Sequence, residues 1–95
     1  MTKTRILIAD DHQVVRKGVA ALLGERPDWE ICAEASTGKE AVAAAARLKP
    51  DVVVMDICMP DMNGLEATRH ILHDNPQTQV LILSMHESDQ LVREV

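Results

Sequence analysis

Four short apolar runs alternate with helix-like segments along the chain, and this alternation constrains the fold more than any other feature of the 95 residues. The runs span residues 6–9, 29–35, 52–55 and 80–83. The third run, Val52-Val53-Val54-Met55, contains no polar residue, which is typical of a strand buried on both faces. The order βαβαβαβα with short connections predicts a single doubly wound α/β domain around a parallel sheet.

The second run, Trp29–Ala35, alternates apolar residues with two glutamates and one cysteine. This period of two predicts a half-exposed strand near an edge of the sheet. The residues predicted to share its apolar face are Trp29, Ile31, Ala33 and Ala35.

Apolar stripes and turn signals predict the helices between the strands. The stripes are Val15, Val19, Leu22 and Leu23, with an end near Gly24; Leu65, Thr68, Ile71 and Leu72; and, behind a cap at Ser88, Leu91, Val92 and Val95. Thr37 and Glu40 match a capping box that starts an alanine-rich helix closing at Leu48-Lys49-Pro50. Gly64 is predicted to be a loop residue that needs a positive φ.

Charge and cysteine usage exclude several classes of function. Ten Lys and Arg against fifteen Asp and Glu give a net charge of −5, which opposes nucleic-acid binding by this segment. Cys32 and Cys58 lack the spacing of a zinc site. The apolar stretch behind Met1–Arg5 is too short for a signal peptide or a membrane span, so we expect a cytoplasmic protein without membrane contact.

Polar residues follow three of the predicted strands. Asp10-Asp11 follow the first strand, Asp56 the third and Ser84 the fourth. The ligand crevice of an open α/β sheet lies beyond the carboxyl ends of its strands, so these side chains are expected to converge. Neighbouring carboxylates repel unless a cation lies among them, and an oxygen-only ligand set favours Mg²⁺. The alternative is that these aspartates only cap helices or lie solvated in loops.

Asp56 follows the most buried run, so its backbone should be the most rigidly held. A carboxylate is ionised at neutral pH and needs no general base to attack phosphorus. Mg²⁺ between the carboxylate and the phosphoryl oxygens removes their repulsion, and the Ser84 hydroxyl can donate to a phosphoryl oxygen. These residues predict the formation of an aspartyl phosphate.

Two segments, Ile6–His12 and Val52–Glu66, resemble the receiver domain of two-component response regulators. Asp11-His12 with Arg16-Lys17-Gly18, and Leu81–His86, resemble the NarL/FixJ subfamily. The resemblance implies a three-layer, flavodoxin-like (CheY-like) fold with strand order 2-1-3-4 and the family's fifth strand missing.

The resemblance also implies a role for each site residue. Asp56 would be the phosphoacceptor, taking the phosphoryl group from a phosphohistidine on a sensor histidine kinase. Asp10 and Asp11 would hold Mg²⁺ with the backbone carbonyl of Cys58, and Ser84 would be the switch hydroxyl. Such a chain is no conventional enzyme; it assists its own phosphorylation and dephosphorylation, as the N-terminal part of a transcriptional regulator.

Other residues near these motifs allow two interpretations. The Cys58 side chain either tunes the lifetime of the phosphoryl group or is a reactive thiol. His86 either gates water attack on the acyl phosphate or is an idle loop residue. We expect Trp29 to pack in the core, and the histidines expected at the surface are His12, His70 and His73.

The chain departs from the family pattern at its end. It stops at Val95, inside what the resemblance makes the fourth helix, so we expect residues 1–95 to be a receiver domain incomplete at its C-terminus. The fifth-strand lysine and a helix-turn-helix DNA-binding domain would then be absent, and phosphorylation would be impaired. The run Val80–Leu83 would be an exposed apolar edge that favours self-association.

Two rival functions remain. A haloacid-dehalogenase-like phosphatase also uses an aspartate at a strand end with Mg²⁺, but it needs a second aspartate where this chain has Cys58. The other rival is a phosphorylation-independent dimerisation or interaction module with a receiver fold.

Overall fold

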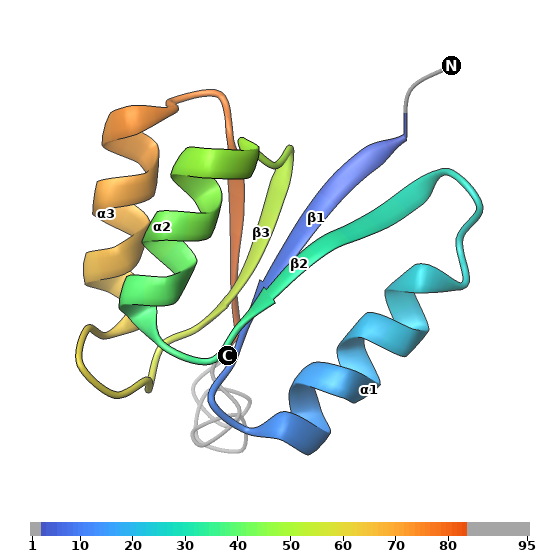
Figure 1. Cartoon of the computed structure of the whole chain (residues 1–95), viewed down its shortest axis with the longest axis horizontal. Coiled ribbons are helices and arrows are strands. Elements are labelled where there is room, and N and C mark those ends of the chain that lie inside the picture. The colour runs from blue at the N-terminus through green and yellow to red at the C-terminus, as the bar shows by residue number, and fades with distance from the viewer. Residues whose placement is uncertain (1–2, 84–95) are drawn as a thin grey trace, which may run out of the picture.

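A four-stranded parallel sheet lies between helices on its two faces in the computed structural model, which describes residues 3–83 (Figure 1). The elements are β1 (Thr4–Ala9), α1 (Gln13–Gly24), β2 (Trp29–Ala35), α2 (Gly38–Leu48), β3 (Val52–Asp56), α3 (Gly64–Asp74) and β4 (Gln79–Leu83). All neighbouring strands pair in parallel, in the order β2-β1-β3-β4. The predicted α/β class and the strand order 2-1-3-4 are confirmed. Ser84, His86 and the helix predicted behind Ser88 lie outside the described residues.

The face of the sheet under α2 and α3 carries the larger core. Leu7, Val53 and Met55 are fully buried there against the two helices. The helices contribute mostly small side chains, which let them lie close to the strands and to each other. The other buried members of this cluster are Ala9, Ala35, Ala41, Ala44, Ala45, Met59, Ala67 and Ile71.

The opposite face is covered by α1 and is packed more loosely. Its buried cluster consists of Ile6, Ile8 and Val54, and within residues 3–83 no α1 side chain is buried. An apolar cavity of about 160 Å³, lined among others by Leu23 and Trp29, lies on this face. The apolar stripe predicted for α1 is wrong at Leu22. This side chain turns away from the sheet and is 68% exposed.

A β-bulge changes the predicted faces of β2. Ile6 of β1 pairs with Ile31, but the next residue, Leu7, pairs with Ala33, so Cys32 is the extra residue. Trp29 and Ile31 consequently pack on the α1 face, whereas Cys32, Ala33 and Ala35 pack on the α2 face. The edge position of β2 is confirmed, but its four apolar residues do not share one face.

The helix starts follow the expected chemistry, with one error in α3. The Thr37 side chain accepts a hydrogen bond from Glu40 N at 3.1 Å, which confirms Thr37 as the cap. The return bond is displaced by one residue, because Glu40 Oε1 accepts from Ser36 N at 2.9 Å. In α3 the stripe prediction is wrong at Leu65, which is 49% exposed, whereas Ala67 is fully buried. A small side chain fits there because α3 lies against both α2 and the sheet.

Candidate functional site

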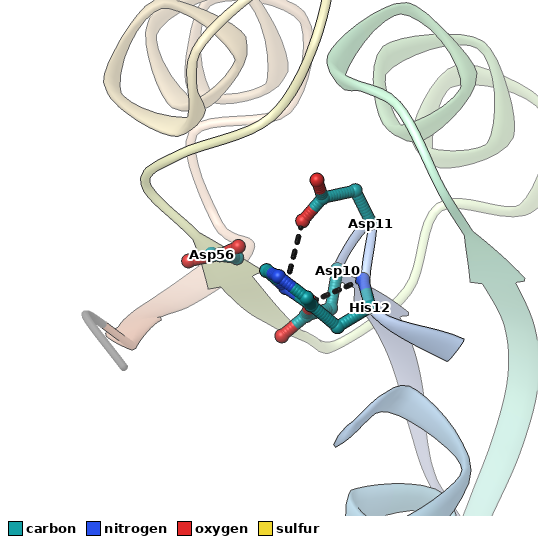
Figure 2. A group of neighbouring side chains, drawn as sticks. All are labelled: Asp10, Asp11, His12 and Asp56. Atoms are coloured by element: carbon teal, nitrogen blue, oxygen red, sulfur yellow. Dashed lines mark hydrogen bonds and ion pairs between the residues drawn. The ribbon is translucent and has the colours of Figure 1, made fainter. Parts of the chain in front are cut away.

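The carboxyl ends of β1 and β3 bring two buried aspartates together. Ala9 pairs with Met55, so Asp10 and Asp56 occupy adjacent positions at one edge of the sheet (Figure 2). Asp56 is 1% exposed and Asp10 is 3% exposed. Their positions follow from two neighbouring parallel strands that both end at the same edge.

Asp11 and His12 complete a compact cluster with these two residues. One potential ligand atom from each of Asp10, Asp11, His12 and Asp56 lies within 4.8 Å of the others. Two like charges at this separation repel by about 3 kcal/mol at an effective dielectric constant of about 20. Three carboxylates so close to one another therefore favour a positive group among them.

His12 lies at the surface as expected, but it also contacts the two neighbouring aspartates. Its side chain is 45% exposed, but Nδ1 lies 3.2 Å from Asp10 Oδ1 and 3.0 Å from Asp11 Oδ1 (Figure 2). Its backbone N also donates to Asp10 Oδ1 at 2.8 Å. The sequence signal for this role is only that His12 directly follows the two aspartates. His70 and His73, by contrast, are exposed on α3 as expected.

Arg16 supports the turn that carries these residues. From α1, its Nη1 donates to the backbone carbonyl of Asp10 at 2.8 Å, and its Nε donates to Glu34 Oε1 at 3.0 Å. Asp10 N in turn donates to the carbonyl of Ala35 at 3.0 Å. The β1–α1 turn is thus tied to α1 and to the end of β2. No pattern in the sequence indicates this contact between Arg16 and the turn.

Gly64 has a different role from the predicted one. No glycine in the described part of the chain has a positive φ; the left-handed residue in this loop is Asp61, at φ 64°. Gly64 is the first residue of α3, and a Cβ there would overlap the backbone carbonyl of Asp56 and lie 2.9 Å from Ile57 Cα. Its N donates to Ile57 O at 2.8 Å. The residue must be glycine because α3 starts directly against the backbone of Asp56.

Residues 6–95 match the response regulator receiver domain family. This chain belongs to that family. The receiver is 42% identical over 93 residues to the transcriptional regulatory protein DegU of Brevibacillus brevis, covering 98% of this chain but 39% of DegU. It therefore spans less than half the length of this curated relative.

Two solved structures place the receiver among regulators of known fold. A LuxR-family response regulator from Aurantimonas sp. is 38% identical, with a TM-score of 0.83 over 95% of this chain and 66% of that chain. A chain of the CheX–CheY–BeF3–Mg²⁺ complex from Borrelia burgdorferi is 26% identical, with a TM-score of 0.84 over 98% of this chain and 70% of that chain. The LuxR-family similarity agrees with the expected NarL/FixJ subfamily.

The receiver's donor set fits a hard divalent cation. Asp10, Asp11 and Asp56 each place a carboxylate oxygen within 4.8 Å of the others. Asp10 and Asp56 are almost fully buried. Cys58, whose carbonyl was predicted as a further ligand, lies in the loop after β3 with an exposed side chain. Cys32 lies elsewhere, in β2, where burial raises the pKa of its thiol.

The described part of the receiver, residues 3–83, contains no helix long and apolar enough to span a membrane.

Proposed function

We propose that this receiver accepts a phosphoryl group on Asp56 from a phosphohistidine of a sensor histidine kinase. The observation that carries the proposal is the position of Asp56: it is buried at the end of a central strand, with ligand atoms of Asp10 and Asp11 within 4.8 Å. A carboxylate used only to cap a helix or to be solvated has no reason to lie buried beside two others.

Asp10, Asp11 and Asp56 would hold Mg²⁺, together with the backbone carbonyl of Cys58. When bound, Mg²⁺ neutralises the negative charge between the Asp56 carboxylate and the incoming phosphoryl oxygens. Ser84, which lies outside the described residues, is proposed as the hydroxyl that donates to a phosphoryl oxygen after transfer.

Asp56 acts as the nucleophile in this proposal. One Oδ forms a bond to phosphorus while the bond from phosphorus to the kinase imidazole nitrogen breaks and its electron pair returns to that nitrogen. The close fit of Gly64 against the Asp56 backbone restricts where the carboxylate can point. Positioning of this kind is the main contribution a protein makes to phosphoryl transfer.

The wider role is proposed from the relatives. DegU is a transcriptional regulatory protein, and we propose that this receiver is the phosphorylated input part of a cytoplasmic transcriptional regulator. Its net charge of −5 opposes DNA binding by the receiver itself. β4 lies at an edge of the described sheet, and its Leu81, on the α1 face, is 56% exposed; we propose that the receiver self-associates through β4.

Uptake of a phosphoryl group from acetyl phosphate tests the proposal. We expect intact-mass spectrometry to show one phosphoryl group on a fraction of the wild-type chains with Mg²⁺, and none after chelation of the cation. Asp56→Asn should abolish uptake. Asp61→Asn is the matched control, because Asp61 is exposed in the same loop and asparagine tolerates its left-handed backbone.

Full uptake by the Asp56→Asn variant would overturn the proposal. Absence of uptake by a wild-type chain that binds Mg²⁺ would favour the phosphorylation-independent interaction module instead. Nothing in the described residues favours that module now, since an interaction surface has no need of three converging carboxylates.

A further inference from the structure

We infer that His12 is a nitrogen ligand of the cation site, so that the site binds first-row transition cations such as Co²⁺ more tightly than Mg²⁺. The inference rests on the proposed function, because it needs the cation that Asp10 and Asp11 are proposed to hold. It adds to that function a ligand of a different chemical class and a consequence for cation choice.

The spacing of the potential ligand atoms is that of a metal site. His12 Nδ1 lies 3.0 Å from Asp11 Oδ1 and 3.2 Å from Asp10 Oδ1. Adjacent ligands of an octahedral cation, each about 2.1 Å from the metal, are about 3.0 Å apart. The imidazole nitrogen is therefore separated from both carboxylates by the distance that separates neighbouring ligands.

Hydrogen bonds within the β1–α1 turn fix the backbone that carries His12. The backbone N of His12 donates to Asp10 Oδ1 at 2.8 Å, and Arg16 holds the Asp10 carbonyl at 2.8 Å. The imidazole thus starts from a backbone that is fixed relative to Asp10. A ligand held in position before the cation binds loses little conformational freedom on binding.

The chemistry of an imidazole ligand determines which cations the site prefers. Oxygen-only sites suit Mg²⁺, whereas an imidazole nitrogen suits first-row transition cations, whose affinities rise along the series from Mn²⁺ to Cu²⁺. Within residues 3–83, the group of Asp10, Asp11, His12 and Asp56 is the one cluster with three or more converging potential metal ligands. His73 lies on α3 with its Nδ1 3.7 Å from Asp74 Oδ1, outside that cluster.

Calorimetric titration of the chain with Co²⁺ and with Mg²⁺ tests the inference. We expect wild type to bind Co²⁺ at least about tenfold more tightly than Mg²⁺. His12→Ala should weaken Co²⁺ binding about tenfold and weaken Mg²⁺ binding by a smaller factor. His73→Ala is the matched control and should change neither affinity. Nitrogen hyperfine coupling to bound Co²⁺ should be present in wild type and absent in His12→Ala.

The His12 side chain is half exposed, so His12→Ala should fold, and thermal unfolding without added cation checks this. His12→Gln serves as a second variant that keeps a polar side chain without the imidazole nitrogen. Equal Co²⁺ affinities in wild type and both His12 variants would overturn the inference, while Asp56-dependent Mg²⁺ binding would leave the proposed function intact. A rise in affinity for both cations in His12→Ala would also overturn it, since the imidazole would then compete with the cation. Failure of wild type to bind Mg²⁺ would count against the proposed function itself.

Discussion

The face of the sheet under α2 and α3 contains eleven buried apolar residues, whereas the face under α1 contains three. On the first face, alanines and glycines bring helices against the strands, and Gly64 places the start of α3 directly on the backbone of Asp56. On the second face, α1 has no buried side chain within residues 3–83 and a cavity of about 160 Å³ remains. The packing around Asp56, on the α2/α3 face, is therefore tighter than the packing around the turn that precedes α1.

This difference divides the site into two halves. Asp56 is fixed by close backbone packing from the α2/α3 face. Asp10, Asp11 and His12 lie in the turn before α1 and are held mainly by hydrogen bonds, including those from Arg16. We infer that substitutions near Asp56 act through packing, whereas substitutions near Asp10 act through a few polar contacts.

Truncation of one leucine on each face should give the largest contrast. Leu7 is fully buried on the α2/α3 face, so Leu7→Ala should lower the free energy of unfolding by about 3 kcal/mol or more. Leu23 is half-buried beside the cavity, and Leu23→Ala should cost about 1 kcal/mol. Urea unfolding of both variants measures the difference. Equal losses would show that the two faces are packed alike.

Substitution of two glycines sharpens the same contrast. Gly64→Ala should destabilise the chain by about 2–3 kcal/mol, because the added Cβ overlaps backbone atoms that cannot move without displacing Asp56. Gly18, inside α1, has no described atom within 4 Å of an added Cβ. Gly18→Ala should stabilise the chain by about 0.5–1 kcal/mol, since alanine is the better helix former. A neutral Gly64→Ala variant would contradict the packing of α3 on Asp56.

The polar half of the site should respond to Arg16. Arg16→Ala removes the donor to the Asp10 carbonyl and should cost about 1–2 kcal/mol. We also expect the Mg²⁺ affinity to fall severalfold, because the turn carrying Asp10 and Asp11 loosens. Lys17→Ala is the control: Lys17 is more exposed and also contacts Glu34, but it should cost less than about 0.5 kcal/mol. Matching effects of the two variants would show that Arg16 acts only through surface charge.

The smallest expected effect on stability comes from Cys32, the extra residue of the β-bulge in β2. Burial raises the pKa of the Cys32 thiol, so the folded chain binds this proton more tightly than the unfolded chain does. The resulting stability is fully present below the ordinary thiol pKa and is lost as the pH rises through the raised value. Urea unfolding at increasing alkaline pH should show a decline that Cys32→Ser reduces and Cys58→Ser does not. Identical pH dependence in all three chains would contradict this assignment.

The sequence was sufficient for the type of single elements and for the edge at which parallel strands end. The β-branched run Val52–Val54 predicted the central strand, and the rule that parallel strands end at one edge predicted that Asp10 and Asp56 would meet. The bulge at Cys32 was not predicted, because an added residue in one strand appears only when its pairing with β1 is known. A helix stripe also cannot show that Ala67 is covered while Leu65 is exposed, because this depends on where α2 lies.

The roles of Gly64 and His12 were not predicted, because both depend on neighbours in the folded chain. Glycine in a loop is most often explained by its own backbone angles, whereas Gly64 is required by the backbone of Asp56, eight positions earlier. His12 lies at the surface as expected, but its place in the acidic cluster was not predicted. Its contacts with Asp10 and Asp11 depend on the shape of the β1–α1 turn, which the sequence alone does not specify.

The central claim is that Asp56, and no other carboxylate of this chain, accepts the phosphoryl group. Borohydride reduction of the chain after incubation with Mg²⁺ and acetyl phosphate tests it most directly, because reduction converts an acyl phosphate into a stable alcohol that peptide sequencing can locate. We predict that the reduced residue is Asp56 alone, and that omission of Mg²⁺ prevents its formation. Reduction at Asp10, Asp11 or Asp61 with Asp56 unmodified would contradict the claim.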